Sequence, residues 1–308
     1  MIDALQKILP QKILRPMQSR LNFDKVFEIR LRAAKPVSIN YGGKFYFLSE
    51  NGISQSVSEN TIIADAKMVS EVVVRATDFS LYAVNDQLKA GFLTLKGGVR
   101  VGIAGEMVRE GEEVKTVKNF SSVNIRIPHE VIGCGEKVYK KCFEDKLHNT
   151  LILSPPGVGK TTMLRDLART LGNRSPCTNV LVVDERNELA AQFLGTSQLD
   201  VGIHTDVIAN CSKEYAFSAG LRTLAPHVIF TDELAGEKDI AAIELAAASG
   251  VCVIASVHAG SHLDLKNKQG FEKLLEKKLF TRFANLEIVD GVGVCVGVYD
   301  AEFNEVEG

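Results

Sequence analysis

The rhythm of hydrophobic and polar positions changes near the middle of the chain. In the first part, the run at 28–32 alternates apolar and charged residues, which is typical of a half-buried strand. Apolar runs flank the glycine pairs Gly42–Gly43 and Gly97–Gly98, and this arrangement predicts two hairpins. Between them, Thr61–Ala76 carries its apolar residues at helical spacing. We therefore predict an α+β domain over residues 1–128.

From residue 150 onward, apolar runs alternate with amphipathic stretches. Strands are predicted at Leu151–Ser154, Val180–Val183, Val228–Thr231 and Val251–Val257. Helices are predicted at 160–171, 213–224 and 237–249, and edge or antiparallel strands at 286–303. Such alternation is typical of a mostly parallel sheet. Residues 150–308 are therefore predicted to form an α/β domain, preceded by a linker and a lead-in helix at 129–149.

Composition places the chain among ordinary globular proteins. Its 308 residues suffice for two domains, with 45% hydrophobic and 24% charged residues, and its net charge of −2 gives no electrostatic reason to bind a polyanion. The cysteines form no C-x-x-C pair, which favours reduced thiols in the cytoplasm. No apolar run approaches the roughly 18 residues of a membrane-spanning helix. Residues 1–20 predict a short surface helix broken by Pro10 and Pro16.

The strongest chemical signal is L-I-L-S-P-P-G-V-G-K-T-T at 151–162. It predicts a strand, a loop of small residues and the first turn of a helix, which is the layout of a phosphate-binding P-loop. The residues predicted to contact ATP or GTP are Ser154, Pro155, Pro156, Gly157, Val158, Gly159, Lys160, Thr161 and Thr162. Lys160 would reach the β- and γ-oxygens, and the Thr161 hydroxyl would ligate Mg²⁺. Ser154 stands where the usual motif has glycine.

Polar residues follow each predicted strand after this loop. They are Asp184–Glu185, Asp232–Glu233 and His258. In an open α/β sheet, ligands bind at the carboxyl ends of the strands. One carboxylate could hold the water shell of Mg²⁺, a second could deprotonate the attacking water, and a polar residue one strand further could sense the γ-phosphate.

The histidines suggest a competing hypothesis, a transition-metal site. His258 and His262 are close in sequence, but Gly260 lies between them and no carboxylate completes a ligand set. We therefore interpret His258, together with Asp184, as a residue that contacts the nucleotide.

Residues 221–259 resemble the core of secretion ATPases, the superfamily that drives type II and type IV secretion and the extension or retraction of pili. The shared order is L-R-T-L-A-P, a strand ending in Glu, an Ala-rich helix, a glycine, a strand and V-H-A. The resemblance implies that Glu233 is the catalytic Walker B glutamate, with Asp232 where many members have glycine. Glu185 falls in the acidic box and is the competing general base. We assign Asp232 and Thr161 to Mg²⁺.

Within that superfamily, the chain is most similar to the stage III sporulation protein AA family. The motifs are S-P-P-G-V-G-K-T-T-M-L-R-D-L-A-R at 154–169, V-V-D-E-R-N-E-L-A at 182–190 and T-D-E-L at 231–234. The resemblance covers nearly the whole chain. It implies a RecA-like P-loop core and a homohexameric, cytoplasmic ATPase that uses ATP and Mg²⁺. It further implies peripheral recruitment to membrane-embedded components of a channel between mother cell and forespore, without stable nucleic-acid binding.

Such a motor needs a charge that detects the γ-phosphate across a domain or subunit boundary. Arg126, in the predicted strand Ser121–Ile127, is the first candidate for this catalytic role, because Pro128 keeps the run extended. Arg100 and Arg222 are second choices.

Two other functions remain open. A RecA-like nucleic-acid motor would need a basic loop with aromatic residues at the centre of the ring, and Gly195–Asn210 is neither basic nor rich in aromatics. A nucleotide-binding assembly platform with little turnover is compatible with Ser154 and with the order of the acidic residues.

Overall fold

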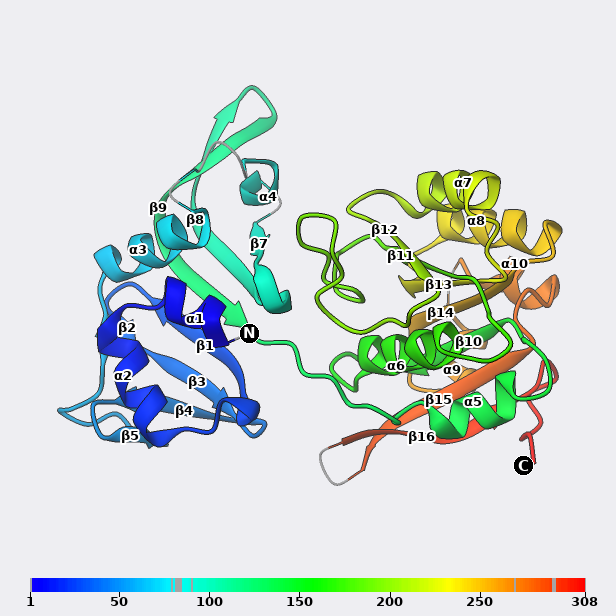
Figure 1. The fold of residues 1–308 in the computed structure, drawn as a ribbon, viewed down its shortest axis with the longest axis horizontal. Helices are drawn as coiled ribbons and strands as arrows, with labels where there is room; N and C mark the ends of the chain where they lie inside the picture. Colours follow the sequence, from blue (N-terminus) through cyan, green and yellow to red (C-terminus); the bar gives the residue numbers. More distant parts are fainter. Residues whose placement is uncertain are drawn as a thin grey trace. The chain divides into compact units, whose positions relative to one another are not determined.

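The computed structural model describes residues 2–78, 80, 85–89, 91–268, 270–289 and 292–307. By its internal contacts, the chain divides into two compact units, Met1–His129 and Glu130–Gly308. Each unit has its own sheet (Figure 1). Of the linker and lead-in helix predicted at 129–149, the residues from Glu130 onward group with the second unit and contain helix α5 (Glu136–Phe143).

The first unit is built on an antiparallel sheet with the order β5-β4-β3-β1-β9-β8-β7. Its strands are β1 (Val26–Arg32), β3 (Ser38–Tyr41), β4 (Lys44–Ser49), β5 (Gly52–Ser54), β7 (Phe92–Thr94), β8 (Arg100–Glu110) and β9 (Glu113–Arg126). The short strands β2 (Lys35–Pro36) and β6 (Ile63–Ala64) pair separately, and single 3-10 turns occur at η1 (Phe23–Lys25) and η3 (Lys96–Gly98). Both predicted hairpins are confirmed as β3–β4 and β7–β8.

Of the predicted short surface helix broken by Pro10 and Pro16, the break at Pro10 is confirmed, but the surface position and the break at Pro16 are wrong. Two helices, α1 (Ile2–Ile8) and α2 (Gln11–Arg20), form there, and Pro16 lies inside α2 without ending it. The side chains of Leu5, Ile13 and Met17 are fully buried in the core of this unit. We attribute the tolerance of the proline to this burial, since a buried apolar side chain contributes about 1.5–3 kcal/mol and offsets the lost backbone hydrogen bond.

The third helix begins later than its apolar spacing predicts. Helix α3 (Ala66–Ala76) starts after Asp65, whose Oδ1 accepts a hydrogen bond from the backbone N–H of Met68 at 2.7 Å. This N-cap satisfies a helix-end donor, and the preceding strand β6 takes the residues predicted as its first turn. The remaining helix of the unit is α4 (Asn85–Lys89).

The second unit contains a mostly parallel sheet with the order β12-β11-β13-β14-β10-β15-β16, in which β16 is antiparallel to β15. Its strands are β10 (Thr150–Ser154), β11 (Val180–Asp184), β12 (Thr205–Ala209), β13 (Val228–Glu233), β14 (Cys252–His258), β15 (Arg282–Val289) and β16 (Val292–Tyr299). The four predicted strands are confirmed. Strand β12 was not predicted, and β15 lies inside the sheet, parallel to β10, rather than at its edge.

Helices cover both faces of this sheet (Figure 1). They are α5, α6 (Lys160–Gly172), α7 (Lys213–Thr223), α8 (Glu237–Ala248), α9 (His262–Lys266) and α10 (Glu272–Glu276). Successive side chains of a strand serve opposite faces: Ile152 packs in the cluster with α5 and α6, while Leu151 packs with α7 and α8. Within the described ranges, no helix is both long and apolar enough to cross a membrane.

Candidate nucleotide site

The loop predicted to bind phosphate connects β10 to α6. Gly157 and Gly159 adopt positive φ angles of 79° and 108°, which glycine accepts without steric cost. The loop is exposed at both glycines, whereas Val158 between them is buried. A strand, a glycine-containing loop and a helix N-terminus therefore follow one another as the motif predicts, and this layout offers backbone N–H groups to an anion.

Lys160 is held at the start of α6 by several acceptors. Its Nζ lies 3.2 Å from the carbonyl oxygens of Ser154 and Pro155, 3.3 Å from the Ser154 hydroxyl and 2.7 Å from Nδ1 of His258. Burial lowers the pKa of Lys160 to about 8, although the nearby charge of Glu233 acts in the opposite direction. The structure therefore brings the predicted loop lysine together with the predicted histidine.

Glu233 joins the same group from strand β13. A bulge near the end of β13 shifts its pairing with β14, and such bulges redirect side chains. Oε2 of Glu233 lies 3.2 Å from Nε2 of His258 and 3.5 Å from Nη1 of Arg186. The contacts thus run without interruption from Lys160 through His258 to Glu233.

Asp184, in contrast, faces its own loop. Its Oδ1 accepts hydrogen bonds from the backbone N–H groups of Glu188 and Leu189 at 2.7 and 3.0 Å, and its Oδ2 accepts one from Ala190 at 2.8 Å. Complete burial raises the pKa of Asp184, although these N–H groups act to lower it. The carboxylate therefore closes the loop after β11, and its contact with a nucleotide stays a prediction.

Glu185 and Asp232 share one buried ammonium group, that of Lys213. Nζ of Lys213 lies 2.5 Å from Oε2 of Glu185 and 3.1 Å from Oδ1 of Asp232. Burial would lower the pKa of Lys213, but the carboxylates of Glu185, Asp232 and Asp239 more than compensate and raise it. Burial also raises the pKa of Asp232 to about 6, against the influence of Lys213.

The donors predicted for Mg²⁺ are oxygen atoms, namely the Thr161 hydroxyl and the Asp232 carboxylate. Mg²⁺ prefers oxygen ligands, keeps several waters and commonly binds through one or two carboxylates together with substrate phosphates. Across the described part of the chain, no group of three or more His, Cys, Asp or Glu residues is arranged to hold a metal. His262, the second histidine of the metal hypothesis, packs against Tyr299 with the two ring centroids 4.1 Å apart and the rings tilted by 38°. The residues present therefore fit a cation that arrives with a nucleotide.

The candidate arginines lie in different parts of the chain. Arg126 is exposed at the end of β9, where it stands opposite Arg100 on β8. Arg222 donates from Nε to the Ser218 carbonyl and from Nη2 to the Ser218 hydroxyl, both at 3.0 Å, and so contacts its own helix. A role for any of them at the γ-phosphate stays a prediction.

Two cations of this site were not assigned a role from the sequence. Lys213 could have been recognised as unusual, because it directly follows the helix-capping Ser212 and so lies in a first turn where acidic residues are favoured. Arg165 carried no such signal. From α6, its Nε donates to the Leu189 carbonyl at 2.7 Å and its Nη2 to the Glu188 carbonyl at 2.9 Å. It thereby ties the helix after the glycine loop to the acidic loop after β11.

The β15–β16 hairpin contacts the glycine loop at Gly293. Gly293 of β16 packs so closely that a Cβ atom at this position would overlap the carbonyl group of Val158. Only glycine fits such an approach without displacing the neighbouring backbone. The position of Val158 is therefore coupled to that of β16.

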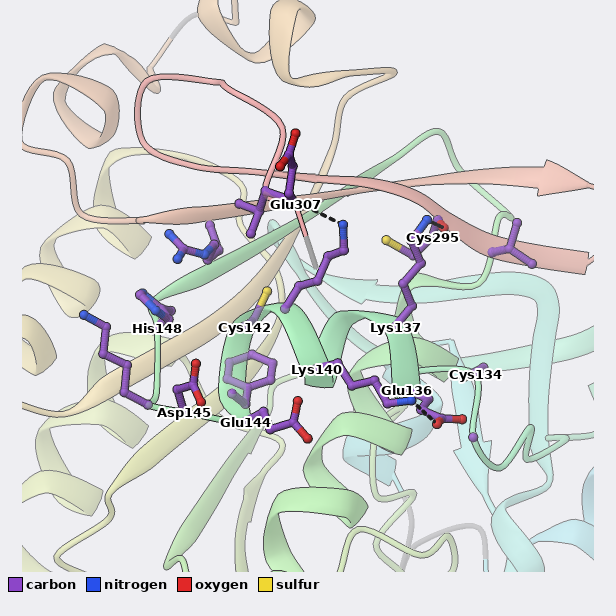
Figure 2. Close-up of a pocket in the computed structure, with 17 residues that line it drawn as sticks. Cys134, Glu136, Lys137, Lys140, Cys142, Glu144, Asp145, His148, Cys295 and Glu307 are labelled. Carbon is purple, nitrogen blue, oxygen red and sulfur yellow. Dashed lines mark hydrogen bonds and ion pairs between the residues drawn. The ribbon is translucent and has the colours of Figure 1, made fainter.

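A separate hollow of about 1060 Å³ lies between α5 and β16 (Figure 2). Lys137 crosses it and donates to the carbonyl oxygens of Cys295 at 3.1 Å and Val296 at 3.2 Å. Lys141 donates to the Val306 carbonyl at 2.5 Å. These lysines cover the edge of β16 and the last residues, and none of the residues predicted for the nucleotide site lines the hollow.

Comparison with known proteins agrees with this picture. The sequence profile described as sporulation stage III, protein AA matches residues 2–306. The stage III sporulation protein AA of Bacillus subtilis (strain 168) is 30% identical over 308 residues, which cover 98% of this chain and 96% of the relative.

Solved structures with the same fold include a pilus retraction motor and an ATPase. The pilus retraction motor PilT with bound ADP superposes with a TM-score of 0.61 at 15% identity, over 94% of this chain and 82% of its own. The ATPase DotB from Legionella pneumophila gives a TM-score of 0.59 at 14% identity, over 91% of this chain and 78% of its own. These values show a shared α/β fold.

Proposed function

The chain belongs to the sporulation stage III protein AA family, and on this premise we propose that it is an ATP-hydrolysing ring motor of the secretion-ATPase type. The second unit is its RecA-like P-loop core. The observation that carries the proposal is the line of contacts from Lys160 through His258 to Glu233, beside a loop with two glycines at positive φ. Similarity of fold to PilT and DotB supports it.

Each residue of this line has a separate task in hydrolysis. The Lys160 ammonium would leave its carbonyl acceptors and compensate the charge of the β- and γ-phosphates. Glu233 would accept the proton of the attacking water, and its contact with Nε2 of His258 would hold it in place. His258 contacts both side chains. A movement of Lys160 toward the phosphates would therefore change the contact between His258 and Glu233.

Magnesium belongs to this proposal as a partner of the nucleotide. When bound, it would neutralise phosphate charge, and Thr161 and Asp232 would hold it. The other partners are proposed at the level of the family: a homohexameric ring that is cytoplasmic, recruited peripherally by membrane-embedded components of a sporulation or secretion channel, and without stable binding of nucleic acid.

The rate of ATP hydrolysis, measured with and without single-stranded DNA, distinguishes this proposal from the two rival functions. An assembly platform would bind Mg·ATP and hydrolyse it at a negligible rate, and a nucleic-acid motor would be stimulated by single-stranded DNA. We propose instead a steady-state ATPase activity that single-stranded DNA leaves unchanged and that anionic lipid vesicles leave unchanged or raise.

The test of nucleotide binding is the variant Lys160→Ala. We expect its affinity for fluorescent mant-ATP to fall at least about 100-fold, because charge-assisted bonds to phosphate are among the stronger interactions of a binding site. Lys238→Ala, an exposed lysine on α8, is the matched control and should bind as the wild type does. Equal affinities of the Lys160→Ala variant and the wild type would refute the P-loop assignment.

A further inference from the structure

Lys213 is an unusual residue for its position. It begins helix α7, where the unpaired N–H groups and the helix dipole favour negative charge. Its side chain is only 4% exposed, and lysine is almost never buried to this extent without an anionic partner. An ammonium group that is disfavoured both by burial and by the helix must be retained by something else in the site.

The partners of Lys213 come from two neighbouring strands of the sheet. Glu185 directly follows β11, Asp232 lies near the end of β13, and these strands pair in parallel. Because both carboxylates lie within 3.1 Å of one nitrogen atom, the ammonium joins the carboxyl ends of the two strands. A second cation lies in the same region, where Nη1 of Arg186 is 3.5 Å from Oε2 of Glu233.

We propose that Lys213 is a positioning residue of the nucleotide site: it is the resident counter-cation that holds Glu185 and Asp232 in one arrangement. This inference rests on the proposed function, since it assigns the two carboxylates to a hydrolytic site. Lys213 fixes their direction and compensates one of their two negative charges, so that a divalent cation is bound there only in company with a nucleotide.

The first test separates catalysis from binding. In Lys213→Met, we expect kcat to fall at least about 30-fold, while KM and the affinity for mant-ADP change less than about 3-fold, because Lys213 is not part of the glycine loop. Lys213→Arg keeps the charge and should restore at least about a third of the lost turnover. Lys277→Met is the control, because Lys277 forms an exposed ion pair with Glu244 at 2.7 Å.

The second test does not depend on activity. In nucleotide-free protein, Mn²⁺ binding is followed by electron paramagnetic resonance. The wild type should bind no Mn²⁺ at this site, whereas Lys213→Met should gain one site, because two carboxylates have lost their cation. Adding Asp232→Asn to Lys213→Met should abolish that gain. If Lys213→Met does not fold, Lys213→Gln replaces it in both measurements, and a Lys213→Gln variant with wild-type turnover and no Mn²⁺ site overturns the proposal.

The outcomes also distinguish this proposal from the function on which it rests. A wild type that binds Mg·ATP without turnover refutes the motor, and the Mn²⁺ measurement still decides the role of Lys213. Lys213→Met with unchanged turnover and no Mn²⁺ site overturns the proposal. So does a parallel loss of melting temperature, nucleotide affinity and turnover without a Mn²⁺ site, because that pattern describes a structural brace.

Discussion

The four carboxylates at the ends of β11 and β13 have different surroundings, although they form two similar acidic pairs in the sequence. Asp184 is enclosed by backbone N–H groups, Glu185 and Asp232 share the ammonium of Lys213, and Glu233 contacts His258. A carboxylate that accepts three N–H groups is fixed in direction. Of the four, Glu233 is therefore the one best placed to respond to the occupant of the glycine loop.

Replacement of Glu233 by glutamine should preserve nucleotide binding and lower turnover by at least about 100-fold, because an amide cannot accept a proton from water. Glu185→Gln is the matched variant on the neighbouring strand and should retain more activity. Steady-state phosphate release and mant-ATP titration of both variants provide the measurement. If Glu185→Gln stops turnover while Glu233→Gln does not, the two assignments must be exchanged.

For Asp184 we predict an effect of substitution on the stability of the protein rather than on its activity. In Asp184→Ala, three backbone N–H groups lose their acceptor, and each buried donor left unsatisfied costs about 1–3 kcal/mol. With some relaxation of the loop, we expect a total loss of about 3 kcal/mol, or roughly 6–12 °C in melting temperature. Asp184→Asn keeps one acceptor oxygen, and its melting temperature should lie between those of the wild type and Asp184→Ala. A shift of Asp184→Ala below about 2 °C would show that the loop does not depend on this carboxylate.

At the scale of elements, local sequence patterns correctly predicted the helices and strands whose formation depends mainly on a single local rule. Glycine pairs predicted the hairpins, and apolar runs with polar ends predicted four strands of the parallel sheet. They failed where tertiary packing decides. Pro16 lies inside α2 because that helix is buried against the sheet, which a local rule for proline does not include.

The residues of the candidate site could be proposed from the sequence, but their contacts could not. The glycine loop and the polar strand ends follow from spacing, and the structure brings Lys160, His258 and Glu233 together as expected for neighbours at one edge of a sheet. The bulge in β13 and the position of Lys213 depend on pairing between distant strands. A single sequence gives no register for such pairs, so these features had to come from the structure.

At the scale of the molecule, the proposal requires that two units of one chain, or of neighbouring chains, cooperate. Arg126→Ala should fold and bind ATP nearly normally, yet hydrolyse it on the order of 10³-fold more slowly, as expected when an arginine no longer reaches a γ-phosphate. Arg109→Ala, an exposed arginine farther along the β8–β9 hairpin, is the control and should keep its activity. Unchanged turnover of Arg126→Ala would show an ordinary surface charge.

Mixing experiments show whether Arg126 acts between chains. Excess Arg126→Ala protein combined with Lys160→Ala protein should recover part of the activity if an intact arginine from one chain completes an intact loop of another. No recovery would mean that the arginine acts within one chain or only braces the fold.

Because Gly293 contacts Val158, the conformation of strand β16 should depend on whether the glycine loop holds a nucleotide. Gly293→Ala adds one methyl group where the Val158 carbonyl lies, and overpacking of about 1–3 kcal/mol should weaken mant-ATP binding about tenfold or more. Val296→Ala, an exposed position on the same strand, should leave it unchanged. Linkage is reciprocal, so nucleotide must in turn change amide hydrogen exchange along β16. If ATP does not change the hydrogen exchange of β16, nucleotide binding at the glycine loop does not affect this strand. If ATP does change it, the exchange of β16 reports nucleotide binding at a distance from the phosphates.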